Sequence, residues 1–172
     1  MSKLIIFLVC ISSINCMVNL DIQRNFGQIT TSYGYPFEEH FVTTSDGYIL
    51  RLFRIPHGLN DEYIPGRPAV LLQHGLLDSA DDYVVRGSEL SPAFYLANNG
   101  YDVWASNSRG NVYSRNHTTL DPDTDPEFWD FSFFDMVEDH QSNIEFILNR
   151  TNLDTITFVG FSVGTTSMFA GL

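Results

Sequence analysis

Runs of apolar residues divide this chain into short strands. Ala69–Gln73 is apolar without alternation, which is typical of a parallel strand buried on both faces, and Tyr101–Ala105 has the same character. Two apolar, β-prone runs flank Ser45-Asp46-Gly47, and this arrangement predicts a β-hairpin with a short glycine turn.

Two segments have the pattern of helices. Ser91-Pro92 opens the first, with Ser91 as the cap and proline in the first turn, and Asn99-Gly100 ends it. The second helix is predicted from about Ser132 to Arg150, and it is amphipathic, with one side facing a sheet. Its apolar residues recur at helical spacing: Phe133, Val137, Ile144, Ile147 and Leu148. Strands alternating with helices predict an α/β fold with a mostly parallel sheet and right-handed crossovers.

The C-terminal stretch Thr155–Leu172 reads as a strand, a sharp turn and a helix, with Ser162 at the turn. Gly160 and Gly164 flank this serine in the pattern G-x-S-x-G, the nucleophile elbow. Any side chain two residues before or after the serine would crowd such a turn. The alternative interpretation is a glycine-rich turn that closes an ordinary βα unit.

A serine nucleophile needs hydrogen-bond donors for the oxyanion that it creates. His74-Gly75-Leu76 follows the Ala69–Gln73 strand. This position suits a loop whose Leu76 N–H would donate to the oxyanion together with the N–H of Val163. Removing one such donor typically costs ~3 kcal/mol of transition-state stabilisation. Taken alone, His-Gly would indicate a strand-end turn with a buried histidine.

Composition and charge narrow the function classes. The 172 residues, 44% hydrophobic and 17% charged, suffice for one domain with a substantial core. A formal net charge of −12 excludes nucleic-acid binding through phosphate contacts. There is no glycine-rich phosphate loop in the sequence.

Residues 1–16 carry Lys3 and an apolar run from Leu4 to Ile14, too short to span a bilayer and typical of a signal peptide. A buried N-terminal strand or an uncleaved anchor is the alternative. Both cysteines, Cys10 and Cys16, lie in this segment, so we expect no disulfide, cysteine nucleophile or cysteine-based zinc site in the mature chain. The expected organisation is a signal peptide (1–16), a polar N-terminal arm (17–32) and a folded domain (33–172).

Two acceptor sequons, at Asn116 and Asn149, predict N-glycosylation in the secretory pathway.

Five blocks of the sequence resemble the acid lipase family, the gastric and lysosomal acid lipase type of α/β-hydrolases. They are G-Y-P-F-E-E-H-F-V-T-T-S-D-G-Y-I-L-R-L-F-R-I-P at 34–56, L-Q-H-G-L-L at 72–77, G-Y-D-V-W-A-S-N-S-R-G-N at 100–111, F-W-D-F-S-F at 128–133 and G-F-S-V-G-T at 160–165. The resemblance implies the N-terminal part of an α/β-hydrolase domain, with Ser162 as nucleophile and Leu76 and Val163 as oxyanion donors.

The resemblance also implies a secreted or lysosomal enzyme that hydrolyses triacylglycerols or sterol esters at a lipid–water interface, without metal or cofactor and without a transmembrane segment after signal cleavage. Two positions depart from the family pattern, which usually has His where Phe161 stands and Gln where Val163 stands. The Val163 backbone N–H is unaffected by its side chain.

The catalytic acid and histidine of the family follow the nucleophile serine in the chain. We therefore expect both beyond residue 172, together with the lid over the lipid pocket. The histidines within the sequence are expected to be structural or loop residues: His40, His57, His74, His117 and His140. Arg109 is expected to brace a loop, and the acids at 121–125 and 135–139 are expected to be solvated.

Two competing functions remain open. One is a catalytically inactive, truncated product that at most binds lipid or a partner. The other is an α/β-hydrolase of different specificity, such as a peptidase.

Overall fold

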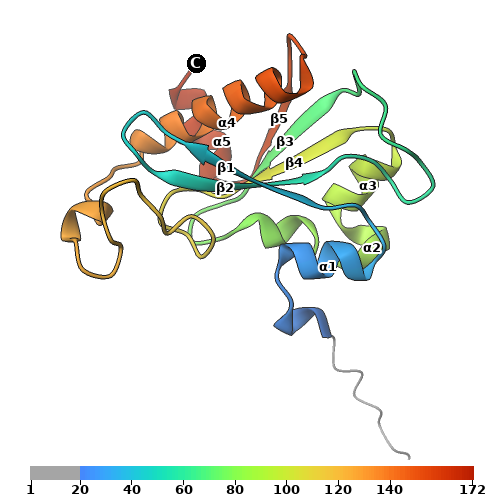
Figure 1. Ribbon diagram of the computed structural model, residues 1–172, viewed down its shortest axis with the longest axis horizontal. Coiled ribbons are helices and arrows are strands. Elements are labelled where there is room, and N and C mark those ends of the chain that lie inside the picture. Colours follow the sequence, from blue (N-terminus) through green and yellow to red (C-terminus); the bar gives the residue numbers. More distant parts are fainter. Residues whose placement is uncertain (1–19) are drawn as a thin grey trace, which may run out of the picture.

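The computed structural model describes residues 20–172, which form a five-stranded sheet with helices on both faces (Figure 1). In chain order its elements are η1 (Leu20–Gln23), α1 (Phe26–Ser32), β1 (Glu38–Thr43), β2 (Ile49–Ile55), β3 (Ala69–Gln73), η2 (Ala80–Tyr83), α2 (Gly87–Leu90), α3 (Pro92–Asn98), β4 (Asp102–Ser106), η3 (Pro126–Trp129), α4 (Asp135–Thr151), β5 (Thr157–Gly160) and α5 (Val163–Ala170). The three η elements are short 3-10 helices.

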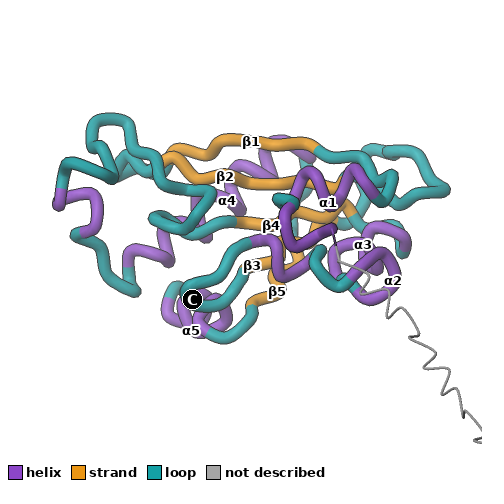
Figure 2. Tube along the Cα trace, turned by 90° about the horizontal axis from the view of Figure 1, so that it is seen from below, coloured by secondary structure: helices purple, strands orange, loops and turns teal. Residues whose placement is uncertain are grey.

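The strands lie in the order β1-β2-β4-β3-β5, which Figure 2 shows from top to bottom. β3 is parallel to both β4 and β5, whereas β2 is antiparallel to both of its neighbours, β1 and β4. The predicted α/β architecture is confirmed, and the predicted hairpin is the β1–β2 pair. Because β3 lies between two parallel neighbours, its carboxyl end and that of β5 meet at one edge, where ligands bind in such sheets.

Each face of the sheet carries its own apolar core. Below the sheet in Figure 1, α1 and α3 pack Phe26 and Phe94 against residues of β2, β3 and β4. On the opposite face, α4 packs Ile147 against Trp104 and its neighbours. All five residues of β3 are buried, as expected for a strand covered on both sides.

The segment predicted as a polar arm is different in the structure. Within it, α1 begins with a capping box, in which the Asn25 side chain accepts the Gln28 N–H and the Gln28 side chain accepts the Asn25 N–H. Phe26 and Ile29 of this helix are buried in the core. The polar composition obscured this helix because only a few apolar residues mark its buried face.

The predicted signal peptide at 1–16 lies outside the described residues. Within 20–172, none of the helices combines the length and the apolar character needed to cross a membrane. Ser91 precedes α3 at the N-cap position, as predicted, but its side chain does not cap the helix. Its Oγ accepts the Arg86 N–H instead.

Candidate active site

Ser162 occupies a strained turn between β5 and α5. Its backbone angles are φ 51° and ψ −117°, in a region that residues with a side chain rarely adopt. The turn is tied to the neighbouring strand because the Phe161 N–H donates to the Gln73 carbonyl at 2.9 Å. Ser162 is exposed, so its hydroxyl is presented to solvent at the carboxyl end of the sheet.

The flanking glycines are required by close backbone contacts. A Cβ at Gly160 would lie 2.7 Å from the Thr165 nitrogen, and one at Gly164 would lie 2.7 Å from the His74 carbonyl oxygen. Real Cβ atoms essentially never approach so closely, so the turn and α5 can pack against β3 only without these side chains.

The loop after β3 lies directly against this turn. A Cβ at Gly75 would lie 3.1 Å from the Phe161 ring and 3.4 Å from Ser162 Cβ. Leu76 and Val163 line the same pocket, of about 210 Å³. Among the described residues, neither of their N–H groups has a hydrogen-bond acceptor assigned to it. The two predicted donors are therefore brought together beside Ser162.

His74 holds this loop in place. Its Nε2 accepts the Ser108 N–H at 3.1 Å, so the ring proton is on Nδ1, which donates to the Gly75 carbonyl at 2.7 Å. Burial lowers the pKa of His74 and keeps the ring neutral. With both nitrogens engaged, His74 positions the loop and does not act on the Ser162 proton.

The pocket beside the donors is mainly apolar. Leu76 and Leu77 contribute from the loop, and Trp129, Phe131 and Met136 contribute from the segment before and at the start of α4. Sequence reasoning did not assign these last three to the site. For Trp129 and Phe131 the signal was the aromatic block at 128–133, whose position at the pocket lined by Leu76 depends on the tertiary fold.

Arg109 braces the rim of the pocket, as predicted. Its guanidinium Nε donates to Asp139 at 2.8 Å and its Nη1 donates to Asp46 at 2.5 Å. The guanidinium also lies over the Tyr48 ring, 4.2 Å from its centroid. The prediction that the acids of 135–139 are solvated is wrong for Asp139, which is buried on the sheet-facing side of α4 to meet Arg109. Burial raises the pKa of Asp139 to about 6, although its hydrogen bonds to Arg109 oppose the shift.

His140 is a buried core residue. Its Nε2 lies 2.7 Å from Ser167 Oγ, and Ser167 in turn donates to the Val163 carbonyl at 2.8 Å. Since the Ser167 proton is used on that carbonyl, His140 Nε2 must donate to the hydroxyl. Burial lowers the pKa of His140 to about 4, so the ring is neutral and links α4 to the first turn of α5.

No ring nitrogen of a histidine in the described part of the chain is hydrogen-bonded to Ser162 Oγ. His40 bonds Glu38, His57 bonds the Gly58 carbonyl and His117 bonds the Asp46 carbonyl. Among residues 20–172, no histidine is therefore placed as a base on Ser162 Oγ.

The remaining predicted residues lie away from Ser162. Asn116 precedes the 117–119 turn and Asn149 lies in the last turns of α4, and both are exposed. Across residues 20–172, the acidic, histidine and cysteine side chains form no group of three or more that could hold a metal ion.

Comparisons with known proteins agree with this geometry. Residues 26–87 match a family model described as a partial alpha/beta-hydrolase lipase region, and residues 68–170 match one described as the alpha/beta hydrolase fold. The chain is 48% identical to gastric triacylglycerol lipase of Bos taurus over 153 residues, covering 88% of this chain and 38% of the relative. It is 45% identical to human lysosomal acid lipase/cholesteryl ester hydrolase over 154 residues, with the same coverages.

Solved structures share the fold at low sequence identity. An esterase of Pyrococcus furiosus matches with a TM-score of 0.58 and 18% identity, over 83% of this chain and 48% of that structure. An epoxide hydrolase of Vigna radiata matches with a TM-score of 0.51 and 17% identity, over 78% of this chain and 33% of that structure. The chain spans 38% of the length of these two lipase relatives.

Proposed function

Because this chain belongs to the α/β-hydrolases and to their acid lipase family, we propose that it carries the nucleophile half of a serine esterase that acts on neutral lipids. The observation that carries the proposal is the placement of Ser162, at positive φ, against the loop after β3, whose Leu76 lines the same pocket as Val163.

In the proposed reaction, Ser162 Oγ attacks the ester carbonyl carbon while a base removes its proton. The negative charge that develops on the carbonyl oxygen is stabilised by the N–H groups of Leu76 and Val163. Collapse of the intermediate breaks the bond to the alcohol, which takes the proton from the base, and water then releases the acid from Ser162. We propose that the base is a histidine outside these 172 residues, because His74 and His140 are engaged elsewhere.

The chemistry of the pocket supports an apolar substrate. Leu76, Trp129, Phe131 and Met136 line it. Of its two charged lining residues, Arg109 is paired with two carboxylates and Asp78 accepts the Ser79 N–H. A hydrocarbon chain of a triacylglycerol or sterol ester suits such a surface, whereas a peptide would leave its polar backbone groups without partners.

Exposed apolar side chains around the turn support action at a lipid–water interface. The exposed fractions are 65% for Leu76, 99% for Leu77 and 60% for Phe161. Large apolar groups clustered on one surface indicate contact with lipid or with another protein segment. We propose that they face the lipid phase or a lid that covers the site.

We also propose passage through the secretory pathway to the cell exterior or the lysosome. The predicted signal peptide and the exposure of Asn116 and Asn149 support this proposal. Loss of mass from the native protein on treatment with an N-glycosidase would test the two sequons.

The decisive experiment is labelling of the native, full-length protein with a fluorophosphonate, which reacts covalently with an activated serine. Ser162→Ala should abolish labelling, and Ser88→Ala, which changes a serine remote from the turn, should leave it unchanged. Hydrolysis should be measured on an emulsified triacylglycerol, a sterol ester and a peptide. Absence of labelling in folded protein would favour a non-catalytic lipid-binding role, and cleavage of the peptide alone would favour a peptidase.

A further inference from the structure

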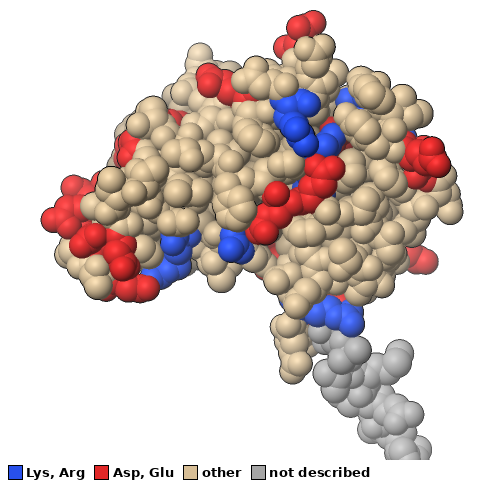
Figure 3. Space-filling view, viewed as in Figure 1, with Lys and Arg blue, Asp and Glu red and all other residues tan. Residues whose placement is uncertain are grey.

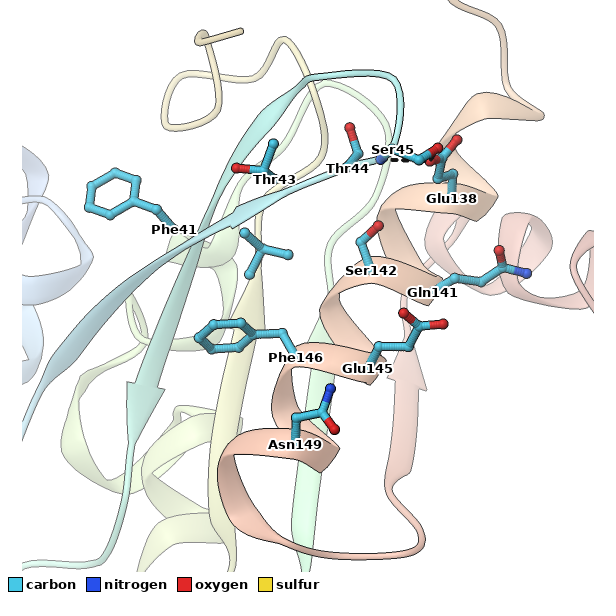
Figure 4. Close-up of a pocket in the computed structure, with 11 residues that line it drawn as sticks. Phe41, Thr43, Thr44, Ser45, Glu138, Gln141, Ser142, Glu145, Phe146 and Asn149 are labelled. Carbon is cyan, nitrogen blue, oxygen red and sulfur yellow. Dashed lines mark hydrogen bonds between the residues drawn. The ribbon is translucent and has the colours of Figure 1, made fainter. Parts of the chain in front are cut away.

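A groove of about 740 Å³ lies between the edge strand β1 and helix α4 (Figure 4). Phe41, Thr43 and Ser45 line one side and Glu138 and Glu145 line the other. Since β1 and β5 are opposite edges of the sheet, the groove is separate from the Ser162 site.

The hydrogen bonds of the hairpin define which backbone groups of β1 face outward. The Thr44 N–H donates to the Tyr48 carbonyl at 2.9 Å, so Thr44 points toward β2. Residues of an antiparallel strand alternate between facing the partner and facing away from it. The backbone N–H and C=O groups of Val42 therefore face β2, and those of Phe41 and Thr43 face the outer edge.

The opposing residues of β2 give the same result. Ile49, opposite Thr43, donates its N–H to the Asn116 carbonyl at 2.9 Å. Arg51, opposite Phe41, donates its N–H to Ser114 Oγ at 3.0 Å. Both bonds point away from β1, so Thr43 and Phe41 are not paired through their backbone to β2.

The α4 side of the groove is polar and acidic. Glu138 and Glu145 face it two helical turns apart, and no arginine or lysine is among the described residues that line it. Glu138 accepts hydrogen bonds from the Ser45 N–H and hydroxyl and so closes one end. Phe146 and the buried Val42 add an apolar surface between the two sides.

We propose that this β1–α4 groove binds an extended peptide segment with basic side chains, which adds as a further strand to β1. The backbone groups of Phe41 and Thr43 would pair with the peptide, as in other cases of strand addition to an exposed sheet edge. Alternate side chains of the peptide would point toward α4, where a lysine or arginine would meet Glu145.

The dimensions suit a segment of about five residues. Five extended residues span ~16 Å, and α4 rises by ~16 Å from Glu138 to Asn149. A second copy of this chain fits less well, since its own β1 edge would bring Glu39 and the two groove glutamates close to their like-charged equivalents. The net charge of −12 opposes such pairing, and Figure 3 shows acidic side chains at many places on one face of the molecule.

The test uses the native protein and a fluorescein-labelled pentapeptide, acetyl-Lys-Thr-Val-Thr-Lys-amide, with the matching Glu-Thr-Val-Thr-Glu peptide as control. Fluorescence anisotropy should show saturable binding of the basic peptide that weakens with salt, and weaker binding of the acidic one. Hydrogen exchange should slow at the Phe41 and Thr43 amides when the basic peptide is bound, because these two N–H groups acquire acceptors.

Two pairs of variants separate backbone pairing from charge. Thr43→Pro removes an outward N–H at an edge, where proline is tolerated, and should weaken binding roughly tenfold, whereas Thr43→Ala keeps the N–H and should bind as the wild type. Glu145→Gln should weaken binding about threefold and Glu89→Gln, on α2, should not.

Each contrary result overturns the proposal. Unsaturable binding, unchanged exchange at Phe41 and Thr43, or equal binding by Thr43→Pro would each exclude strand addition by a basic peptide. Concentration-dependent dimerisation that Thr43→Pro abolishes, without peptide binding, would identify a second copy as the occupant instead.

Discussion

Substitution of Gly164 by alanine provides a direct test of how α5 and β3 position the oxyanion donors. A Cβ at this position would lie 2.7 Å from Gln73 Cγ and 2.7 Å from the His74 carbonyl oxygen. Ordinary van der Waals contact begins near 3.4 Å. The helix and the strand end must therefore separate by about 0.7 Å, in a region too closely packed to absorb the change locally.

This separation acts on the site because the two donors belong to different elements. The Val163 N–H is carried by the first turn of α5, and the Leu76 N–H by the loop that follows β3. A displacement approaching 1 Å can cost about 100-fold in rate, and loss of one donor costs ~3 kcal/mol. We therefore expect kcat/KM of the full-length enzyme to fall roughly 100-fold.

Stability should change much less. Alanine is favoured over glycine within a helix by ~1 kcal/mol, and overpacking costs ~1–3 kcal/mol. The net loss for Gly164→Ala is therefore ~0–2 kcal/mol, which leaves the protein folded for assay.

The assay is the rate of inactivation by a fluorophosphonate together with kcat/KM on a soluble ester. Gly100→Ala is the matched control: its φ of +87° makes alanine unfavourable, but no atom lies within 4 Å of the new Cβ and the site is remote. It should lose ~1 kcal/mol of stability and keep wild-type activity. Wild-type reactivity of Gly164→Ala would refute the inferred coupling between α5 packing and oxyanion geometry.

Three further substitutions test the fold around the site. Arg109→Met should lower the free energy of unfolding by ~3–5 kcal/mol, because it leaves the carboxylate of Asp139 buried without its partner. Urea denaturation measures this loss, and the double variant Arg109→Met/Asp139→Leu should recover most of it. Burial and a neighbouring carboxylate raise the pKa of Asp82 to about 6, so its ionisation disfavours the folded state. Protonation of Asp82 therefore stabilises the folded state, and this stabilisation is complete below pH ~4 and is lost as the pH rises through about 6. Asp82→Asn should therefore raise Tm at pH 7 and leave it unchanged at pH 4, and the exposed Asp154→Asn should change neither; an increase that persists at pH 4 would contradict this assignment. Asn25→Ala should cost ~1 kcal/mol by removing the capping box of α1, and an unchanged thermal midpoint would show that tertiary packing alone holds that helix.

Much of the architecture could be predicted because its signals are local. The buried strand β3 was found with its correct bounds from five consecutive residues, and the β1–β2 hairpin from the turn at Gly47. The helix α1 was missed, since Phe26 and Ile29 are buried only by contact with distant strands. Local polarity says little about a short helix of this kind.

The features of the candidate site also divide into those set by neighbouring residues and those set by contacts between distant residues. By itself, the sequence determined the strained serine turn, the glycines it requires and the loop after β3, because each is a demand that a few neighbouring residues make on the backbone. Only the tertiary structure decided that His74 bonds Ser108, that Asp139 is buried against Arg109 and that Phe131 and Leu76 line one pocket. These partners are separated by 30 or more residues in the two hydrogen-bonded cases. Their charge states and roles depend on burial and on which distant groups meet, and neither is encoded in a local pattern.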